Sequence, residues 1–224
     1  MRLISLIASG PLVVATLACA SKPVAQNPAE PPPPQEAPRQ PSRPLAGFAA
    51  QKILVMPARY LRVNDAVGWN DQIGASAEFL KRVDDELTFA LRERGVQGSW
   101  VLPADVVKSA KRNATYVADP YALGEEALRP PRKVPDLIPD PLATQLRGLV
   151  ALHEGARYAL LPVEVRFEKI GTSQARAVLH LVVIDTRMVQ ARWSGEVASD
   201  PALVYSNAVA ASLAARVADL ISAP

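Results

Sequence analysis

Apolar and polar positions repeat with different periods along the chain, and each period predicts a secondary-structure element. Residues 52–57 contain an apolar run that ends at Pro57, which is typical of a strand covered on both faces. Residues 77–94 place their apolar side chains three and four positions apart, which predicts an amphipathic helix. We expect Ser76 to cap this helix and Gly95 to end it, because these residue types favour those positions.

Shorter elements follow this helix. Residues 99–102 predict a second strand, and a proline at the start of residues 103–112 predicts a short helix there. Residues 113–139 contain five prolines and no sustained period, apart from a helical turn expected around 121–128. This segment is unusually long for a connection, and we interpret it as an irregular loop of the domain.

Two helices and three strands are expected in the rest of the chain. The helices begin at Asp-Pro pairs, at residues 140 and 200, and Gly155 ends the first of them. In the first strand Pro162 indicates a strand end, a bulge or an edge position. The second strand is apolar on both faces and should be central, whereas the third alternates so that one face is solvated. The three strands are 157–169, 175–185 and 189–197.

The order of these elements predicts an α/β (α+β) sandwich, in which helices pack on a mixed sheet of about five strands. With 49% apolar and 21% charged residues, the chain can bury a core. From residue 47 onward it has 21 basic and 20 acidic residues, so its charge does not indicate a nucleic-acid-binding protein.

The N-terminal residues have the pattern of an export signal. Arg2 precedes an uncharged, mostly apolar run over residues 3–17, which is shorter than the roughly 20 residues of a membrane-spanning helix. We therefore expect residues 1–18 to be a signal peptide. Ala18-Cys19 after this run resembles the lipobox of bacterial lipoproteins, in which the cysteine thiol receives a diacylglycerol and becomes the new N-terminus.

Cys19 is the only cysteine, so neither an intramolecular disulfide nor a multi-cysteine zinc site can form. The lipobox resemblance implies that Cys19 is lipidated and anchors the protein to a membrane. Because Ala20 stands where an inner-membrane retention signal often has Asp, it also implies the outer membrane, with the protein facing the periplasm. The alternative is a signal-peptidase cut after Ala20, which would release a soluble periplasmic or exported protein.

A proline-rich segment separates this signal from the folded part. Residues 22–44 hold nine of the 21 prolines and few side chains that could form a core. Such a segment favours extended polyproline II and could hold a domain on the order of 70 Å from a membrane. We therefore expect a lipidated cysteine and disordered linker over residues 19–46 and a periplasmic α/β domain over residues 47–224.

Three short motifs in the C-terminal half carry a family resemblance. Residues 155–163 read GARYALLPV, residues 181–187 read LVVIDTR and residues 192–196 read RWSGE. They resemble envelope lipoproteins whose domain is similar to the N-terminal domain of TolB, the curli secretion lipoprotein and the penicillin-binding-protein activator lipoproteins. The resemblance implies a non-enzymatic periplasmic domain that contacts other envelope components, and it supplies no catalytic residue.

Few residues suit catalysis or metal binding, and we expect no catalytic residue, metal or cofactor. His153 is followed by Glu154, but an arginine stands where a zinc-binding helix motif needs its second histidine. The chain has no glycine-rich phosphate loop, no dinucleotide fingerprint and no nucleophile-elbow motif. The carboxylates of residues 84–86 are expected on a solvated helix face.

Two groups of residues are candidate binding sites. The long loop 113–139 combines aromatic and basic side chains that suit an envelope protein partner, although a solvated insertion explains it equally well; they are Tyr116, Tyr121, Arg129, Arg132 and Lys133. At the sheet edge, Arg166, His180 and Arg192 could line a pocket for a small ligand or a cell-wall fragment.

The sequence therefore favours a membrane-anchored periplasmic lipoprotein that acts as a non-catalytic accessory or scaffold in a cell-envelope complex. A small-ligand or cell-wall-fragment binder is the alternative. A hydrolase with dispersed residues ranks third, because it needs a nucleophile within reach of His153 or His180.

Overall fold

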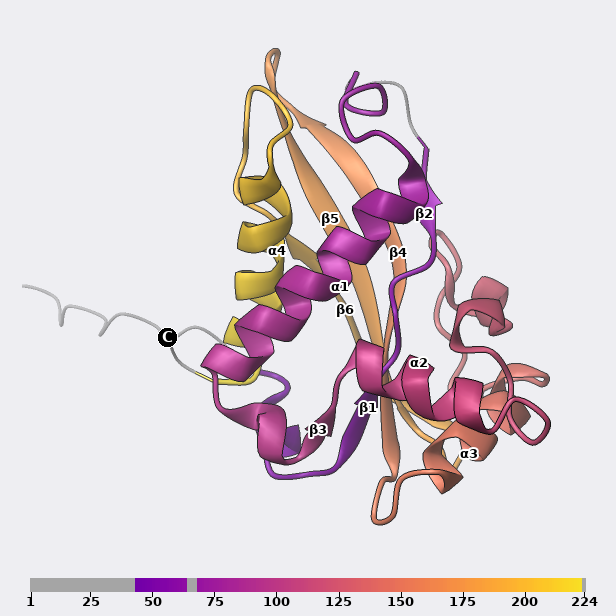
Figure 1. Ribbon diagram of the computed structural model, residues 1–224. Coiled ribbons are helices and arrows are strands. Elements are labelled where there is room, and N and C mark those ends of the chain that lie inside the picture. Colours follow the sequence, from indigo (N-terminus) through magenta and orange to yellow (C-terminus); the bar gives the residue numbers. More distant parts are fainter. Residues whose placement is uncertain (1–42, 64–67, 223–224) are drawn as a thin grey trace, which may run out of the picture. The chain divides into compact units, whose positions relative to one another are not determined.

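The computed structural model describes residues 43–63 and 68–222 (Figure 1). The expected signal peptide, Cys19 and nearly all of the proline-rich linker lie outside the described residues. Among the helices that are described, none is long and apolar enough to cross a membrane.

Six strands and four α-helices make up the described part of the chain, which is an α+β fold. The strands are β1 (Ile53–Val55), β2 (Leu61–Arg62), β3 (Trp100–Val101), β4 (Tyr158–Ile170), β5 (Gln174–Asp185) and β6 (Gln190–Ala198). The helices are α1 (Ser76–Glu93), α2 (Pro103–Arg112), α3 (Leu142–Ala151) and α4 (Asn207–Asp219). Short 3₁₀ turns are η1 (Ala46–Phe48), η3 (Val96–Gly98), η4 (Pro120–Ala122) and η5 (Glu125–Leu128).

The strands form one mixed sheet. Its order is β3–β1–β4–β5–β6, and β2 pairs separately with β4. The pairs β1–β3, β1–β4 and β2–β4 are parallel, whereas β4, β5 and β6 are antiparallel neighbours. The predicted mixed sheet is confirmed, and β5 is central, as its apolar sequence on both faces indicated.

Helices α1 and α4 cover one face of the sheet (Figure 1). The periodic apolar side chains of α1 are buried there, including Phe79, Val83 and Leu87. Four aromatic rings meet in this core with centroids 5.3 to 6.4 Å apart, and they are Trp69, Phe79, Phe167 and Tyr205. Tilted rings at such distances stabilise a core beyond the area that they bury.

Helices α2 and α3 cover part of the opposite face, together with the long loop 113–139 (Figure 1). Leu123, Leu128 and Ile138 of the loop are buried in this second core. The loop also joins the sheet, because the Ile138 amide donates to the carbonyl of Val189 at 2.9 Å. The loop lacks a period because it forms turns around prolines, yet its apolar side chains help to close the core.

A bulge at Pro162 decides which side chains of β4 face which core. The register to β5 shifts between Pro162 and Glu164. Before the shift, Leu161 faces the second core, and after it Val165 faces the first core. As a result, the side chains of Glu164, Arg166 and Glu168 lie on the same face of the sheet as the second core. The bulge is one of the three positions that the proline predicted.

Two predicted helix starts are wrong. Helix α1 already includes Ser76, and the residue before it, Ala75, makes no side-chain capping bond. Helix α4 begins at Asn207 rather than at residue 200, because Ala202 first pairs with Ala175 of β5 through two backbone hydrogen bonds of 2.8 and 2.9 Å. A backbone occupied by a strand partner cannot begin a helix at the same place.

Candidate functional site

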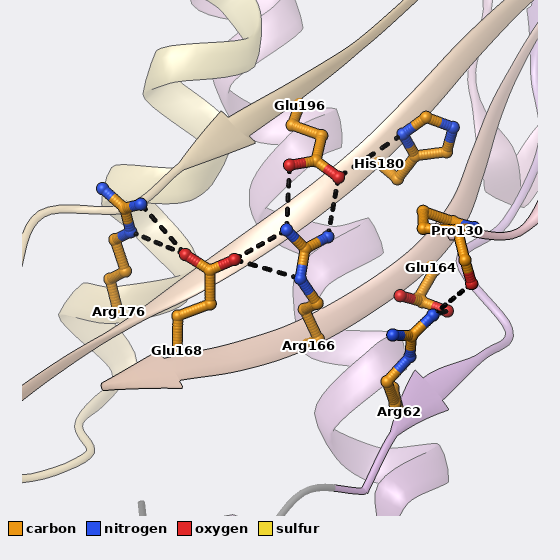
Figure 2. A network of polar contacts seen from close by, with 8 residues as sticks. All are labelled: Arg62, Pro130, Glu164, Arg166, Glu168, Arg176, His180 and Glu196. Atoms are coloured by element: carbon orange, nitrogen blue, oxygen red, sulfur yellow. Dashed lines mark hydrogen bonds and ion pairs between the residues drawn. The ribbon is translucent and has the colours of Figure 1, made fainter. Parts of the chain in front are cut away.

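A network of charged side chains, which we call the charged ladder, crosses strands β4, β5 and β6 (Figure 2). It consists of Arg166, Glu168, Arg176 and Glu196. Arg166 lies at its centre and donates to Glu196 from Nη1 and Nη2, both at 2.8 Å. Its Nε and Nη2 also donate to Oε1 of Glu168, whose other oxygen accepts from Arg176. Each nitrogen of the Arg166 guanidinium therefore has an acceptor.

These contacts shift the titration of the carboxylates. Arg166 lowers the pKa of Glu196 below its usual value, chiefly by donating hydrogen bonds to the ionised form. For Glu168, burial alone would raise the pKa, but the hydrogen bonds from Arg176 and Arg166 outweigh it and the net shift is downward. The ladder therefore remains ionised at neutral pH and is a set of mutually satisfied charges.

His180 lies in β5 beside this ladder and is 8% exposed. Its Nδ1 is 3.9 Å from Oε1 of Glu196, and neither ring nitrogen has a hydrogen-bond partner among the described residues. Burial lowers its pKa, so the ring is neutral at neutral pH. Its burial follows from the position of β5 between β4 and β6 in the sheet.

A separate ion pair between Arg62 and Glu164 lies next to the charged ladder. Glu164 is fully buried, and its Oε2 accepts from Nη2 of Arg62 at 2.8 Å. The same nitrogen of Arg62 donates to the carbonyl of Pro130 in the long loop (Figure 2). One arginine thus connects β2, β4 and the loop, although these segments are far apart in the sequence.

The structure brings two of the three predicted pocket residues together. Arg166 and His180 both meet Glu196, whereas Arg192 is exposed on β6 four residues before that glutamate. Because Arg166 already has an acceptor for every nitrogen, an incoming anion would have to displace a carboxylate from it. A ligand-binding role for the three residues stays a prediction.

The predicted loop residues differ in their surroundings. Tyr116 is 85% exposed and Tyr121 is 49% exposed. Arg132 and Lys133 are also exposed. Arg129 instead lies over the ring of Tyr60, with its Cζ 3.9 Å from the ring centroid, and only 19% of its side chain is exposed. Four of the five side chains therefore remain accessible to a partner, and a partner contact by the loop stays a prediction.

The other histidine is close to a hydroxyl group. His153 Nε2 lies 2.9 Å from Ser109 Oγ, which is also 2.9 Å from the carbonyl oxygen of Val106. A serine hydroxyl has one proton, so if it donates to Val106 it must accept from the imidazole. In that arrangement His153 cannot take a proton from Ser109, and the pair is not prepared as a nucleophile and base.

A cavity of about 610 Å³ opens between α1, η4 and the segment from β1 to β2. Asp84 of α1 lies in its wall and is only 7% exposed, so the prediction that it lies on a solvated face is wrong. Its Oδ1 accepts from the amide of Ala58 at 2.8 Å. Burial raises the pKa of Asp84 to about 7. The sequence does contain a signal, since Asp84 follows Leu80 by four residues and precedes Leu87 by three, at the border of the apolar stripe.

A second buried carboxyl group lies behind the wall of this cavity. Glu125 of η5 is fully buried, and its Oε2 is 3.3 Å from Nε of Arg59. Neither oxygen of Glu125 accepts a well-aligned hydrogen bond from the described residues. Burial raises its pKa to about 8 against the opposing charges of Arg59 and Arg129. No pattern in the sequence indicates that Glu125 is buried, because its burial depends on the folding of the loop.

Among residues 43–63 and 68–222, no group of three or more His, Cys, Asp or Glu side chains could hold a metal ion.

The ion pair between Arg157 and Asp185 explains the aspartate in the motif LVVIDTR of residues 181–187. Asp185 ends β5, is fully buried, and accepts from Nη2 of Arg157 at 2.5 Å and from the amides of Arg187 and Met188. The aspartate thus holds the turn between β5 and β6, which is a structural role.

No protein-family model and no curated protein matches the sequence. Several solved structures are similar in fold. The PelC dodecamer from Paraburkholderia phytofirmans is 17% identical, with a TM-score of 0.37, over 83% of this chain and 98% of that chain. The LpoB C-terminal domain from Escherichia coli is 14% identical, with a TM-score of 0.36, over 69% of this chain and 86% of that chain. Lipoprotein GNA1162 from Neisseria meningitidis is 18% identical, with a TM-score of 0.30, over 75% of this chain and 96% of that chain. The likeness is loose and concerns the fold.

Proposed function

We propose that this protein is a lipoprotein of the bacterial cell envelope, anchored through Cys19, whose folded domain serves as a non-catalytic accessory that contacts another envelope protein. The observation that carries the proposal is the position of the only cysteine, which follows Ala18 at the end of an apolar run too short to span a membrane. The proline-rich segment that follows then acts as a spacer. We further propose that the anchor lies in the outer membrane.

The long loop 113–139 is the proposed contact surface. Tyr116 is 85% exposed, while Leu123, Leu128 and Ile138 of the same loop are buried. An exposed tyrosine on an anchored loop loses little conformational freedom when a partner covers it, and tyrosine and arginine are enriched at protein interfaces. Arg132 is exposed in the same loop and adds a positive charge.

The anchor is tested by labelling cells with an alkyne analogue of palmitate and fractionating their membranes. The natural protein is expected to incorporate the label and to sediment with the outer membrane. The variant Cys19→Ser should lose both properties, while Ser21→Ala serves as the matched control that retains them. A mature protein that begins at Ser21 and stays soluble would contradict the anchor and indicate an ordinary signal-peptidase cut.

The contact surface is tested separately by photocrosslinking in intact cells. A photoreactive residue at Tyr116 or Arg132 is expected to capture one envelope protein reproducibly. The control position is Phe89 on α1, which is also exposed, at 63%, but belongs to another element. Equal capture at Phe89, or no capture at Tyr116 and Arg132, would show that the loop is not the contact surface.

A further inference from the structure

The cavity beside α1 is lined by apolar, aromatic and charged side chains. Ala58, Leu61, Ala77 and Leu80 supply apolar lining, and Tyr121 of η4 supplies an aromatic ring. A volume of about 610 Å³ lies in the range of pockets that hold small organic ligands. Asp84, more than nine-tenths buried, is the acidic side chain that lines it.

The two cations of the cavity wall already have partners. Lys81 donates to Asp85 at 2.7 Å, pointing along the exposed face of α1. Arg59 donates to the carbonyl of Tyr121 at 2.7 Å and lies within 3.4 Å of Glu125 and Glu126. Neither cation forms an ion pair with Asp84 in the part of the chain that the structure describes.

Asp84 itself uses only one carboxyl oxygen. Oδ1 accepts from the Ala58 amide, whereas Oδ2 accepts no hydrogen bond from any described residue. A buried carboxylate without a cationic partner is costly, and a ligand that supplies the missing positive charge and hydrogen-bond donor would remove that cost. Burial also raises the pKa of Asp84, and the hydrogen bond from Ala58 and the charge of Lys81 oppose this rise without cancelling it.

We infer that this cavity is a binding site for a primary ammonium group carried on an apolar body, with Oδ2 of Asp84 as the acceptor. The ammonium donates to Oδ2, and the apolar body packs against Leu61, Leu80 and the ring of Tyr121. The ligand's ammonium can come from a free small amine or from a lysine side chain of a partner protein. The site goes beyond the proposed anchor and requires neither Cys19 nor the loop contact at Tyr116.

The test is an NMR titration of the folded protein that follows the amide of Ala58, because this amide donates directly to Asp84. Phenethylamine is the probe for a free amine, and Nα-acetyl-lysine methylamide is the probe for a lysine side chain. 2-Phenylethanol and 3-phenylpropionate have similar bodies without the positive charge. We expect a saturable shift of the Ala58 resonance with at least one ammonium probe, and a much weaker response to the neutral and anionic compounds.

The variant Asp84→Asn keeps an oxygen acceptor for Ala58 and nearly the same volume, so its Ala58 resonance also reports that the site is folded. It is expected to bind the ammonium probe at least about tenfold more weakly. Glu93→Gln is the matched control and should bind as the natural protein does, because Glu93 is exposed at the far end of α1 and does not line the cavity.

Response to phenethylamine alone would identify a free amine as the ligand class, and response to the lysine derivative would identify a protein side chain. The inference would be overturned if neither ammonium probe shifts Ala58 at millimolar concentration. It would equally be overturned if 2-phenylethanol or 3-phenylpropionate binds as tightly, or if Asp84→Asn binds without loss.

Discussion

The indole ring of Trp193 lies directly over Gly195, two residues further along β6. A Cβ atom at Gly195 would come within 2.5 Å of Cζ2 and 2.8 Å of Cη2 of the indole. Trp193 in turn packs against the first core at the sheet edge. The Trp-Ser-Gly motif therefore has a physical explanation, because only glycine leaves room for the ring to lie flat on the strand.

The first prediction follows from this contact. Gly195→Ala should lower the free energy of unfolding by about 1–3 kcal/mol, since the ring must move out of its place in the core. Chemical denaturation measures the loss, and near-ultraviolet circular dichroism reports the displaced indole. Gly98→Ala is the control, because a Cβ there meets nothing within 4 Å. An alanine at 195 that leaves both measurements unchanged would refute the close contact.

The second prediction compares Arg62 with Arg176 of the charged ladder. Arg62→Ala leaves the fully buried Glu164 without its cation and should cost about 2–3 kcal/mol of unfolding free energy. Arg176→Ala removes a partner from Glu168, which is 32% exposed and keeps Arg166, so its cost should stay below about 1 kcal/mol.

Urea denaturation of both variants decides between them. The double variant Arg62→Ala/Glu164→Gln should recover part of the loss, because it no longer buries an unpaired charge. Equal costs for Arg62→Ala and Arg176→Ala would mean that the burial of Glu164 has no energetic consequence.

The third prediction concerns pH. Burial raises the pKa of Asp84 from 3.8 in its usual state to about 7, so the folded protein binds a proton that the unfolded chain releases. The stabilising effect of that proton is complete below about pH 4 and is lost as the pH rises to about 8. Glu125, whose pKa is raised to about 8, acts in the same direction.

Unfolding free energies measured across this pH range isolate the effect of Asp84. The natural protein should lose on the order of a few kcal/mol relative to Asp84→Asn between about pH 4 and pH 8. Glu93→Gln, at an exposed position of the same helix, should follow the natural protein over the same range. If Asp84→Asn and the natural protein have parallel pH profiles, the carboxyl group of Asp84 is not desolvated in the folded state.

The regular elements could be predicted because their signals are local. The apolar stripe of α1 and the termination at Gly95 follow from residues within one helix, and Gly95 does adopt a positive φ of 74°. From the sequence, Pro162 indicated only that β4 has an edge, an end or a bulge at this residue. All three are compatible with a residue that has no amide hydrogen to donate. Strand β2 was missed, since two residues carry no period.

The same distinction between local signals and contacts of distant segments applies to the residues of the candidate sites. The sequence by itself determined the helices, the three antiparallel strands and the absence of recognisable catalytic motifs, because these depend on neighbours along the chain. Only the tertiary structure decided that Asp84 is buried, since its partner Ala58 lies 26 residues away, and that Glu164 pairs with Arg62 across 102 residues. Burial and charge pairing are set by segments that meet in space, and a one-dimensional pattern does not record which segments meet.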